Sequence, residues 1–342
     1  MATTPRRQNL VPYAIQSRAP FTIRLVWVTV VTIASLAYVP LAFAYVTAEI
    51  RRTLMVTATE PLTLDVEIPS GELQILYGRD GRVSIAGFAR ASADTKLDDN
   101  FFPAVLTIEQ NGNHFSIRHV PNLAYPEEGI NVSYRIDVPY RTEVTSRLSK
   151  GKQNISGILG PVKAATGKGD IKASYVSKGL QAQVENGNLD LQVIGEHVDA
   201  RAGNGNISCM RVAQGVSAET EDGDITLMVV GPSTATVEKG IGRIDVGGAR
   251  SGFVGSTDGG DIHIRAIPHD DWQLSSASGN IQLEFPPVAK FELDASTHSG
   301  QFQVDRDDIS RPDADPHHLR QKVNGGGKRI EVHTGSGRIV LR

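Results

Sequence analysis

Carboxylate and imidazole side chains lie close together in the sequence between residues 258 and 271. Such groups act as general acids and bases, and some parallel β-helices use them on one sheet face to cleave acidic polysaccharides. Their spacing assigns none of them a role, and charged residues on the outward face of a strand are the ordinary case. A polysaccharide-active enzyme is therefore the third interpretation of this chain, and we expect no catalytic site. The residues concerned are Asp258, Asp261, His263, His269, Asp270 and Asp271.

The segment 305–328 holds a second group of acids beside two adjacent histidines and ends in three glycines. Neighbouring His and carboxylate side chains are potential zinc ligands. The segment is polar and has no periodicity, however, which favours a solvated loop inserted between coils, and such insertions often carry the function of a scaffold. We predict neither a metal site nor a cofactor. The side chains are Asp305, Arg306, Asp307, Asp308, Asp313, Asp315, His317 and His318.

A short phrase, Gly followed by Asp or Asn and then an aliphatic residue, recurs along the second half of the chain. Its steps are 18 residues from Gly169 to Gly223, and 18 or 19 as far as Gly279. Gly- and Asp-rich nonapeptide repeats bind Ca²⁺ in β-rolls, and 18 is twice that period. Here half of each period lacks Gly-x-Gly-x-Asp, and three phrases have Arg243, Gln301 or Arg338 at the Asp position. These features favour structural turns without a cation.

Each phrase predicts a turn between two strands, because Gly permits positive φ and Asp or Asn can bond the backbone two residues on. We expect Arg243 to pair with both Asp224 and Asp261 in a column of such turns. The column consists of Gly169, Asp170, Gly187, Asn188, Gly205, Asn206, Gly223, Asp224, Gly242, Arg243, Gly260, Asp261, Gly279 and Asn280.

Apolar and polar residues alternate after every phrase, and more weakly before it, which indicates two short strands per repeat, each with one buried face. A strand pair this short buries its apolar face only against stacked neighbours. We therefore predict an all-β, parallel β-helix-like solenoid of about 18 residues per coil, ahead of an antiparallel sandwich. The aliphatic residues predicted to form an inward column are Ile171, Leu189, Ile207, Ile225, Ile244, Ile262 and Ile281.

Composition narrows the functional class. The chain has 342 residues, a net charge of −3, 34 glycines and one cysteine. A charge near zero offers no footprint for nucleic acid. Cys209 falls at a core-facing strand position, and without a partner it is expected to behave as a small buried hydrophobe.

The N-terminal region predicts a membrane anchor. Residues 1–24 carry four Arg and no acid and are expected to form a disordered cytoplasmic tail, and residues 25–46 are uncharged and long enough to cross a bilayer as a helix. The basic side stays inside, with Trp27 and Tyr45 as interface anchors. A signal peptide cleaved at Ala44 is the alternative. Either way, the remaining β-domain is expected in the periplasm or outside a bacterial cell, attached to the inner membrane where the anchor is retained.

Residues 54–150 also alternate but lack the tight repeat, and we expect irregular first coils and an N-terminal cap, or else a separate small β-domain, before a regular solenoid over 151–342. The run Val132–Pro139, Ser149-Lys150-Gly151, Ile155-Ser156-Gly157 and the recurring Gly-Asp/Asn-Ile phrase resemble the bacterial "putative adhesin" β-strand-repeat family, a domain of unknown function. The resemblance covers roughly residues 60–342. It implies an exported, often membrane-anchored solenoid, and its motifs are structural rather than catalytic.

These patterns favour a non-catalytic binding or scaffolding module of the cell envelope, with a protein or polysaccharide ligand. A sensor that reports envelope state to the tail is the alternative. The chain stops at Arg342 in a strand phrase, and an unpaired edge is a template for another strand. We therefore expect either that residues 305–328 cap the last coil or that two copies associate end to end.

Overall fold

A computed structural model describes residues 45–342 except 58–59, 126–127, 239–240, 250 and 311–314. The predicted cytoplasmic tail and residues 25–44 of the predicted membrane helix lie outside the described residues. The last two residues of that predicted helix, Tyr45 and Val46, instead begin strand β1 (Tyr45–Met55), where they pair with β3. The guanidinium of Arg90 lies over the ring of Tyr45, with its Cζ 3.6 Å from the ring centroid. Among the described residues no helix has the length and hydropathy needed to span a bilayer.

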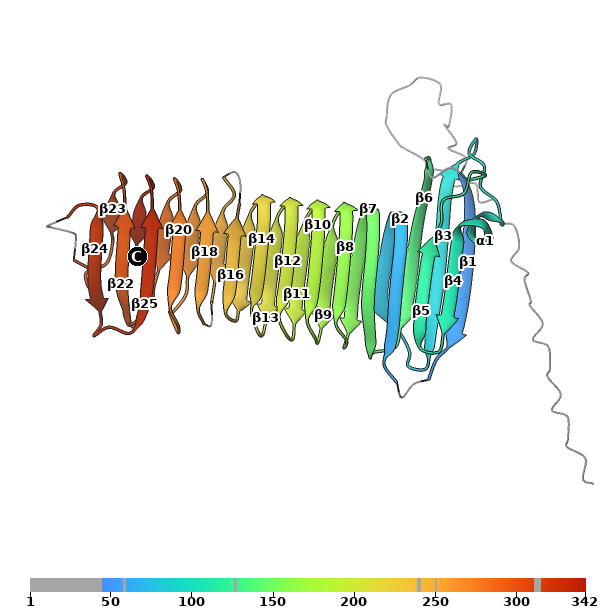
Figure 1. Ribbon diagram of the computed structural model, residues 1–342, viewed down its shortest axis with the longest axis horizontal. Coiled ribbons are helices and arrows are strands. Elements are labelled where there is room, and N and C mark those ends of the chain that lie inside the picture. Colours follow the sequence, from blue (N-terminus) through green and yellow to red (C-terminus); the bar gives the residue numbers. More distant parts are fainter. Residues whose placement is uncertain (1–44, 58–59, 126–127, 239–240, 250, 311–314) are drawn as a thin grey trace, which may run out of the picture.

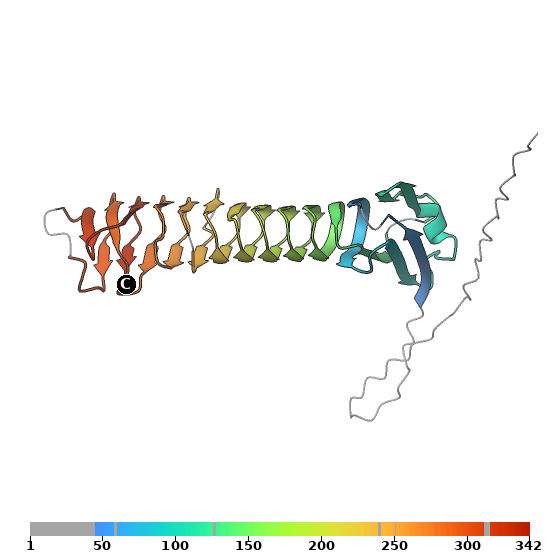
Figure 2. The ribbon, with the colours of Figure 1, turned by 90° about the horizontal axis from the view of Figure 1, so that it is seen from below.

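The described chain is an elongated stack of coils (Figure 1), and Figure 2 shows its two sheets as two layers. The first strands of the coils form sheet A, and the second strands form sheet B. Sheet A runs in the order β4 (Leu106–Asn111), β5 (His114–His119), β2 (Leu62–Tyr77), β7 (Thr142–Ile158), β8 (Val162–Lys168), β10 (Leu180–Asn186), β12 (Val198–Asn204), β14 (Val216–Asp222), β16 (Ser233–Val237), β18 (Phe253–Thr257), β20 (Trp272–Ser276), β25 (Lys328–Thr334), β22 (Phe291–Thr297) and β24 (His318–Val323).

Sheet B stacks its strands along the same axis as sheet A. The first halves of β2 and β7 belong to sheet A and their second halves to sheet B. Its order is β1, β3 (Arg82–Ser92), β6 (Ile130–Val138), β2, β7, β9 (Ile171–Val176), β11 (Leu189–Ile194), β13 (Ile207–Val212), β15 (Ile225–Val230), β17 (Ile244–Gly247), β19 (Ile262–Arg265), β21 (Ile281–Glu284), β26 (Ile339–Leu341) and β23 (Phe302–Val304). The all-β solenoid predicted from the repeat is confirmed, since its strands pair in parallel with residues one period away.

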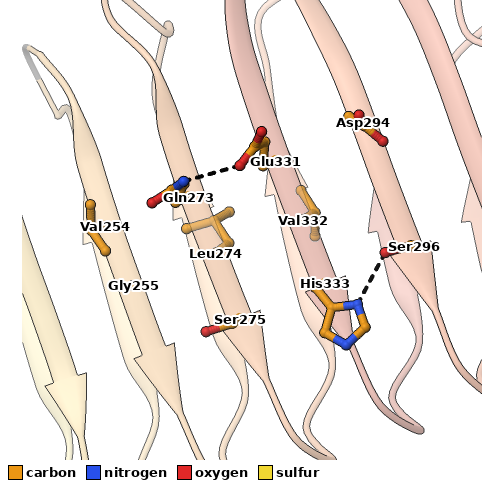
Figure 3. Close-up of a pocket in the computed structure, with 10 residues that line it drawn as sticks. All are labelled: Val254, Gly255, Gln273, Leu274, Ser275, Asp294, Ser296, Glu331, Val332 and His333. Carbon is orange, nitrogen blue, oxygen red and sulfur yellow. Dashed lines mark hydrogen bonds between the residues drawn. The ribbon is translucent and has the colours of Figure 1, made fainter.

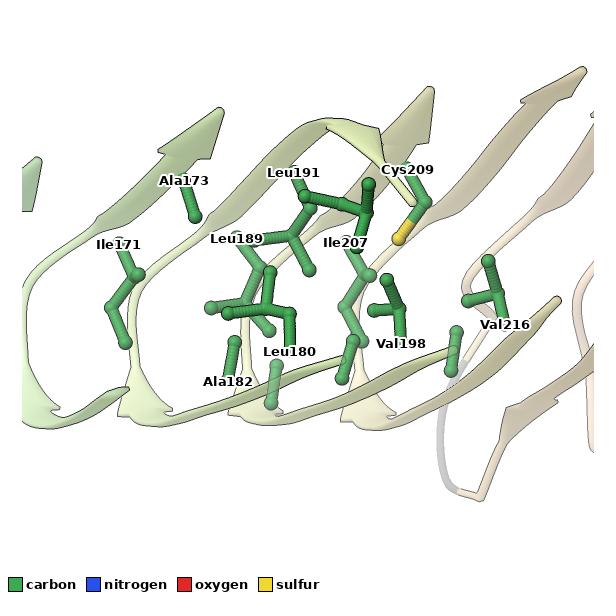
Figure 4. Close-up of a cluster of buried hydrophobic side chains, with 14 of the residues drawn as sticks. Ile171, Ala173, Leu180, Ala182, Leu189, Leu191, Val198, Ile207, Cys209 and Val216 are labelled. Carbon is green, nitrogen blue, oxygen red and sulfur yellow. The ribbon is translucent and has the colours of Figure 1, made fainter. Parts of the chain in front are cut away.

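The predicted inward column is also confirmed. Leu189 lies in register between Ile171 and Ile207, and Figure 4 shows their side chains in successive layers between the two sheets. All seven residues of the column are at most 1 % exposed. Cys209 belongs to the next column and is fully buried, which raises the pKa of its thiol to about 12. Burial therefore keeps this thiol protonated and unreactive.

The turn column forms, but its side chains bond differently from the prediction. Instead of bonding its own turn, each Asp or Asn turns its Oδ1 toward the next coil and accepts the backbone N–H of the equivalent residue there. The donor–acceptor distances are 3.0 Å for Asn188 to Asp170, 3.0 Å for Asn206 to Asn188, 2.8 Å for Asp224 to Asn206 and 2.7 Å for Arg243 to Asp224. The expected ion pairs of Arg243 with Asp224 and Asp261 are therefore wrong. Asp224 accepts the backbone N–H of Arg243, and the Arg243 guanidinium pairs with no acid among the described residues.

A second hydroxyl motif closes the turns of the C-terminal coils. In the sequence pattern Ser/Thr-x-x-Gly, the hydroxyl accepts the N–H of its own Gly and donates to the Gly carbonyl of the preceding coil in the stack. Ser276 Oγ accepts from Gly279 N at 2.8 Å and donates to Gly260 O at 3.1 Å. Thr334 repeats both bonds with Gly337 and Gly279. These buried hydroxyls satisfy backbone groups that would otherwise be unpaired.

The regular coils begin earlier than residue 151. β7 is a complete coil that bends at Gly151, and β2 bends at Gly71, which lies directly opposite Gly151. The predicted boundary was late because the Gly phrases of these coils, Ser-Gly-Glu-Leu and Lys-Gly-Lys-Gln, lack the Asp or Asn. Strands β1, β3 and β6 extend sheet B, and the β4–β5 hairpin extends sheet A, so this region is continuous with the solenoid.

An aromatic cluster fills the wider N-terminal end, where helix α1 (Phe101–Val105) lies. Phe101, Phe102, Tyr125 and Tyr134 contact one another edge to face with centroid distances of 5.0–5.9 Å. His119 is buried among them, with Nδ1 2.7 Å from Tyr134 Oη. Burial lowers the pKa of His119 to about 4.

Acid should therefore destabilise the protein through His119. An unfolded His takes up a proton below pH 6.5, whereas folded His119 does so only near pH 4, so stability is lost as the pH falls through this window. Between pH 7 and pH 4.5 the loss should be about 2 to 3 kcal/mol. Urea unfolding at both pH values measures it. His119→Asn, which keeps a partner for Tyr134, should lose about 2 kcal/mol less over the same interval, and an equal loss in both proteins would contradict the assignment.

The order of the last coils differs from the order of the chain. β25 and β26 form a coil that lies between the coil of β20 and β21 and that of β22 and β23, so the C-terminus lies inside the stack (Figure 1). Part of the predicted loop 305–328 is strand β24, which pairs antiparallel with β22 and covers the end of sheet A. Ile309 is 3 % exposed, and Arg306 Nη1 donates to Phe285 O at 2.8 Å. The segment thus caps the solenoid, but over β22 rather than over the C-terminal coil. Association with a second copy remains a prediction.

Candidate ligand-binding groove

The acidic and imidazole residues singled out between 258 and 271 do not form one site. Asp261 belongs to the turn column and accepts the N–H of Asn280 at 2.7 Å. Asp270 binds Lys328 Nζ at 3.0 Å, and Asp271 accepts the N–H of Arg329. His269 is exposed, and Asp258 accepts the N–H of Ser278 through its backbone carbonyl. Successive residues of a coil face different sides of the stack, so neighbours in sequence are separated in space.

His263 alone takes part in a charged cluster, on the outer face of sheet B. It lies between Asp245 Oδ1 at 3.6 Å and Glu284 Oε1 at 3.2 Å. Glu284 also accepts from Arg265 at 2.6 Å, and this bond, ahead of those from Gln282 and His263, lowers its pKa to about 2. A carboxylate held ionised by three donors is a weak base at neutral pH. The cluster is therefore built as an ion-pair network.

The His and Asp residues of segment 305–328 bond to separate partners, some within the segment and some outside it. His318 Nε2 lies 2.8 Å from Asp294 Oδ1, whereas Asp305 pairs with Arg342 and Asp308 with Arg306. Asp313 lies outside the described residues. Within the described part of the chain, no three His, Cys, Asp or Glu residues converge as a metal site would require.

The outer face of sheet A, by contrast, is hollowed near the N-terminal end. One hollow of 710 Å³ lies between the cap and the first coils, lined by Arg118, Val120 and Pro121 on one side and by β7, β8 and β10 on the other. A second of 230 Å³ continues across β8, β10 and β12. Both are lined by Arg147, Ala165 and Gln183. We call this continuous surface the Arg147 groove.

The small residues of β8 provide the floor of the Arg147 groove. Ala165 stands between the longer side chains of Arg147 and Gln183 on the neighbouring strands, because parallel register places residues one period apart side by side. Below it, Gln153 is buried and its Nε2 donates to Ala165 O at 2.6 Å and to Thr166 Oγ1 at 2.9 Å. A buried, fully bonded amide fixes this strand in place.

Polar groups without partners line the groove. Arg147 and Lys163 are exposed and form no ion pair or side-chain hydrogen bond among the described residues. Asp199 Oδ2 accepts from Arg201 Nη1 at 2.9 Å, but its Oδ1 is buried without a hydrogen-bond partner. An acceptor of this kind normally binds water or a ligand donor. The groove therefore presents cations beside the carboxylates of Glu67, Glu185 and Asp199, and it can bind anionic and hydroxyl groups.

A third hollow, of 400 Å³, lies on the same face near the C-terminal end (Figure 3). Its polar groups are already paired: Gln273 donates to Glu331 at 3.0 Å, and Ser296 Oγ lies 3.0 Å from His333 Nδ1. Bonds from His318, Arg320 and Arg329 lower the pKa of Asp294 to about 2. The Arg147 groove is the better candidate, because its side chains keep free bonding capacity.

The Arg147 groove was missed in the sequence because its walls come from distant segments. Arg118 belongs to the β4–β5 hairpin and Arg147 to β7. The two arginines come to line one hollow because β5 and β7 both pair with β2. One local signal was present, since Ala165 and Gly167 are small residues at outward positions of an alternating strand. Such positions ordinarily carry polar side chains.

Two sheets of stacked parallel strands with a polar hollow on one outer face define a β-solenoid with a surface groove. The chain belongs to the Toastrack DUF4097 family, whose model matches residues 105–342. This match confirms the family resemblance of the repeated phrase. No functionally curated protein matches the sequence.

Three solved structures that match share little sequence with this chain. A "putative cell adhesion protein" from Clostridium sporogenes shares 10 % identity over 86 % of this chain and 98 % of its own, with a TM-score of 0.21. A "putative adhesin" from Bacteroides fragilis shares 14 % identity over 86 % and 97 %, with a TM-score of 0.29. Another from Parabacteroides distasonis shares 10 % identity over 86 % and 97 %, also with a TM-score of 0.29. None of these similarities identifies a ligand.

Proposed function

We propose that this protein is a non-catalytic binding module of the bacterial cell envelope and that the Arg147 groove holds a segment of an envelope polysaccharide. Residues 25–44 anchor it to the inner membrane, and the solenoid lies on the far side from the cytoplasm. The uncharged length of that segment and its basic N-terminal flank support this orientation.

The observation that carries the proposal is the continuous groove over Ala165, with unpaired donors and an unpaired acceptor along it. A polysaccharide presents hydroxyl donors and acceptors along its whole length. A shallow, open groove lets a long polymer enter and leave at both ends, whereas a small molecule is usually bound in an enclosed, mostly apolar cavity.

Retention of the purified full-length chain on immobilised envelope polysaccharides tests the proposal. Ala165→Trp should abolish retention by filling the floor shared by the two hollows. Thr236→Trp is the matched control, because Thr236 occupies the same outward row of sheet A four coils away. Equal retention of both variants would place the ligand elsewhere. New reducing ends during incubation would show chain scission and overturn the non-catalytic assignment.

A further inference from the structure

Positive charge is concentrated in the first regular coils of the solenoid. Residues 141–178 contain eight Lys or Arg and two acids, a formal charge of +6, and we call them the basic collar. The next stretch, 179–224, contains two Arg and eight acids, a formal charge of −6. The chain's net charge of −3 conceals this contrast. A band of one sign beside a band of the other positions a charged partner along the stack.

Most cations of the basic collar lack an acid. Lys152, Lys172 and Lys178 pair with Asp170, Asp190 and Glu196 at 3.9, 3.3 and 2.8 Å. The other five form no ion pair among the described residues: Arg141, Arg147, Lys150, Lys163 and Lys168.

The parallel register adds to this unbalanced charge. It places Lys150 directly beside Lys168 on the neighbouring strand, and such strands lie about 4.8 Å apart. Like charges directly opposite each other destabilise a sheet. A bound anion would relieve this repulsion, so the arrangement points to an anionic ligand.

The basic collar and the Arg147 groove share their central residues. Arg147 and Lys163 line the groove from β7 and β8, and Arg118 approaches from the cap, held only loosely by Glu67 at 3.9 Å. Lys150 and Lys168 stand at the turn where these strands leave sheet A. Cations thus continue from the groove around the corner of the first two regular coils.

We infer that the Arg147 groove and the five unpaired cations of the adjoining basic collar bind an acidic polysaccharide. Its anionic groups lie over Arg147 and Lys163, and its hydroxyl groups face Gln183 and the carboxylates of Glu185 and Asp199. This inference rests on the proposed polysaccharide-binding function and adds the charge of the ligand. Of the acidic residues from 179 to 224, Glu185 and Asp199 line the groove itself, so the anionic groups are expected on its β7 and β8 side.

The shape of the site disfavours other polyanions. Among the described residues no Phe, Tyr or Trp lines the groove, so these residues offer the bases of a single-stranded nucleic acid no stacking platform. Arg147 lies between the cap segment at Val120 and Pro121 and the coils. Vesicle binding distinguishes a flat membrane, which would contact the lysines at the corner.

Binding of polygalacturonate to the full-length chain at pH 7 and low salt tests the inference, because its methyl ester keeps the backbone and removes the charge. Polygalacturonate should bind at least tenfold more tightly than the ester. Arg147→Gln with Lys163→Gln should raise its Kd at least tenfold. Lys172→Gln with Lys178→Gln removes the same net charge from paired cations and should change the Kd less than twofold. Added salt should weaken binding by screening these charges.

Each alternative predicts a different result. If the methyl ester binds as tightly and Ala165→Trp abolishes both, the groove binds polysaccharide but the charge inference fails. If neither polymer binds, the proposed function has no support from this ligand class and the inference falls with it. Polyphosphate that matches polygalacturonate would overturn the role of hydroxyl groups. Binding to phosphatidylglycerol vesicles that Ala165→Trp leaves intact would assign the collar to a membrane. Salt-dependent dimers in light scattering would assign it to a second copy.

Discussion

Replacing Ile225 with Asp is expected to lower the free energy of unfolding by about 4 kcal/mol or more, because it buries a carboxyl group without a partner. Ile225 is 0 % exposed and stands in register between Ile207 and Ile244. Each layer of the core has only these two neighbours above and below it, so the damage falls on the interface between adjacent coils. Thermal and urea unfolding of the purified protein measure the loss.

Two control variants separate charge from volume and position. Thr234→Asp introduces the same charge on the exposed face of sheet A, beside Ser217 and Val254, and should change stability by about 0.5 kcal/mol at most. Ile225→Val removes one methylene from the column and should cost about 0.5 to 1.5 kcal/mol. If Ile225→Asp unfolded like Thr234→Asp, the side chain would not face the core.

The regular coils were predictable because their local and long-range signals coincide. The phrase Gly205-Asn206-Ile207 marks a turn by its residue types, and its recurrence 18 residues later places Ile207 beside Ile225. A solenoid repeats one contact, so a single period read from the sequence determines the whole column. The side-chain bonds of the turns were not predictable in this way, since Asn206 has backbone N–H groups within reach in its own coil and in the next.

The order of the final coils could not be inferred from their phrases. Gly300-Gln301-Phe302 and Gly337-Arg338-Ile339 each join the two strands of a coil, and either fits against Ile281 by its apolar residue alone. The structure places Ile339 there and Phe302 beyond it. The antiparallel pairing of β24 with the outer edge of β22 explains this choice, because it occupies the edge that β25 would otherwise take. That pairing depends on contacts across residues 291–323, which no local pattern encodes.

The sequence contains the charge pattern of the candidate site, but the net charge of the whole chain conceals it. A net charge near zero argued against a nucleic-acid partner, although residues 141–178 and 179–224 differ by twelve charges. Solenoid coils preserve such segmental differences, since each stretch of sequence stays in its own layer of the stack. The groove itself required the pairing of β5 and β7 with β2, a contact of high sequence separation. Segmental charge is thus predictable for this fold, whereas the hollow that uses it is not.

The central glycines offer the second large effect. Gly205 has φ +148°, and a Cβ on it would lie 1.9 Å from the carbonyl oxygen and 2.6 Å from the carbonyl carbon of Gly187. The obstructing atoms belong to the backbone of the preceding coil, so they can move only if the coils separate. Gly205→Ala should therefore cost about 3 to 5 kcal/mol, the sum of a strained backbone and an overpacked contact.

Substitutions at two other glycines measure the backbone strain and the contact between coils separately. Gly112, in the β4–β5 turn, has φ +59° and nothing within 4 Å of a Cβ, so Gly112→Ala should cost only the left-handed penalty of about 1 to 2 kcal/mol. Gly260 has a φ outside the left-handed region, but its Cβ would lie 1.8 Å from Gly242 O, so Gly260→Ala isolates the contact between coils at about 1 to 3 kcal/mol. Urea unfolding of the three variants should rank Gly205→Ala as the least stable. If it matched Gly112→Ala, backbone conformation alone would explain the glycines, and the close stacking of the turn column would be wrong.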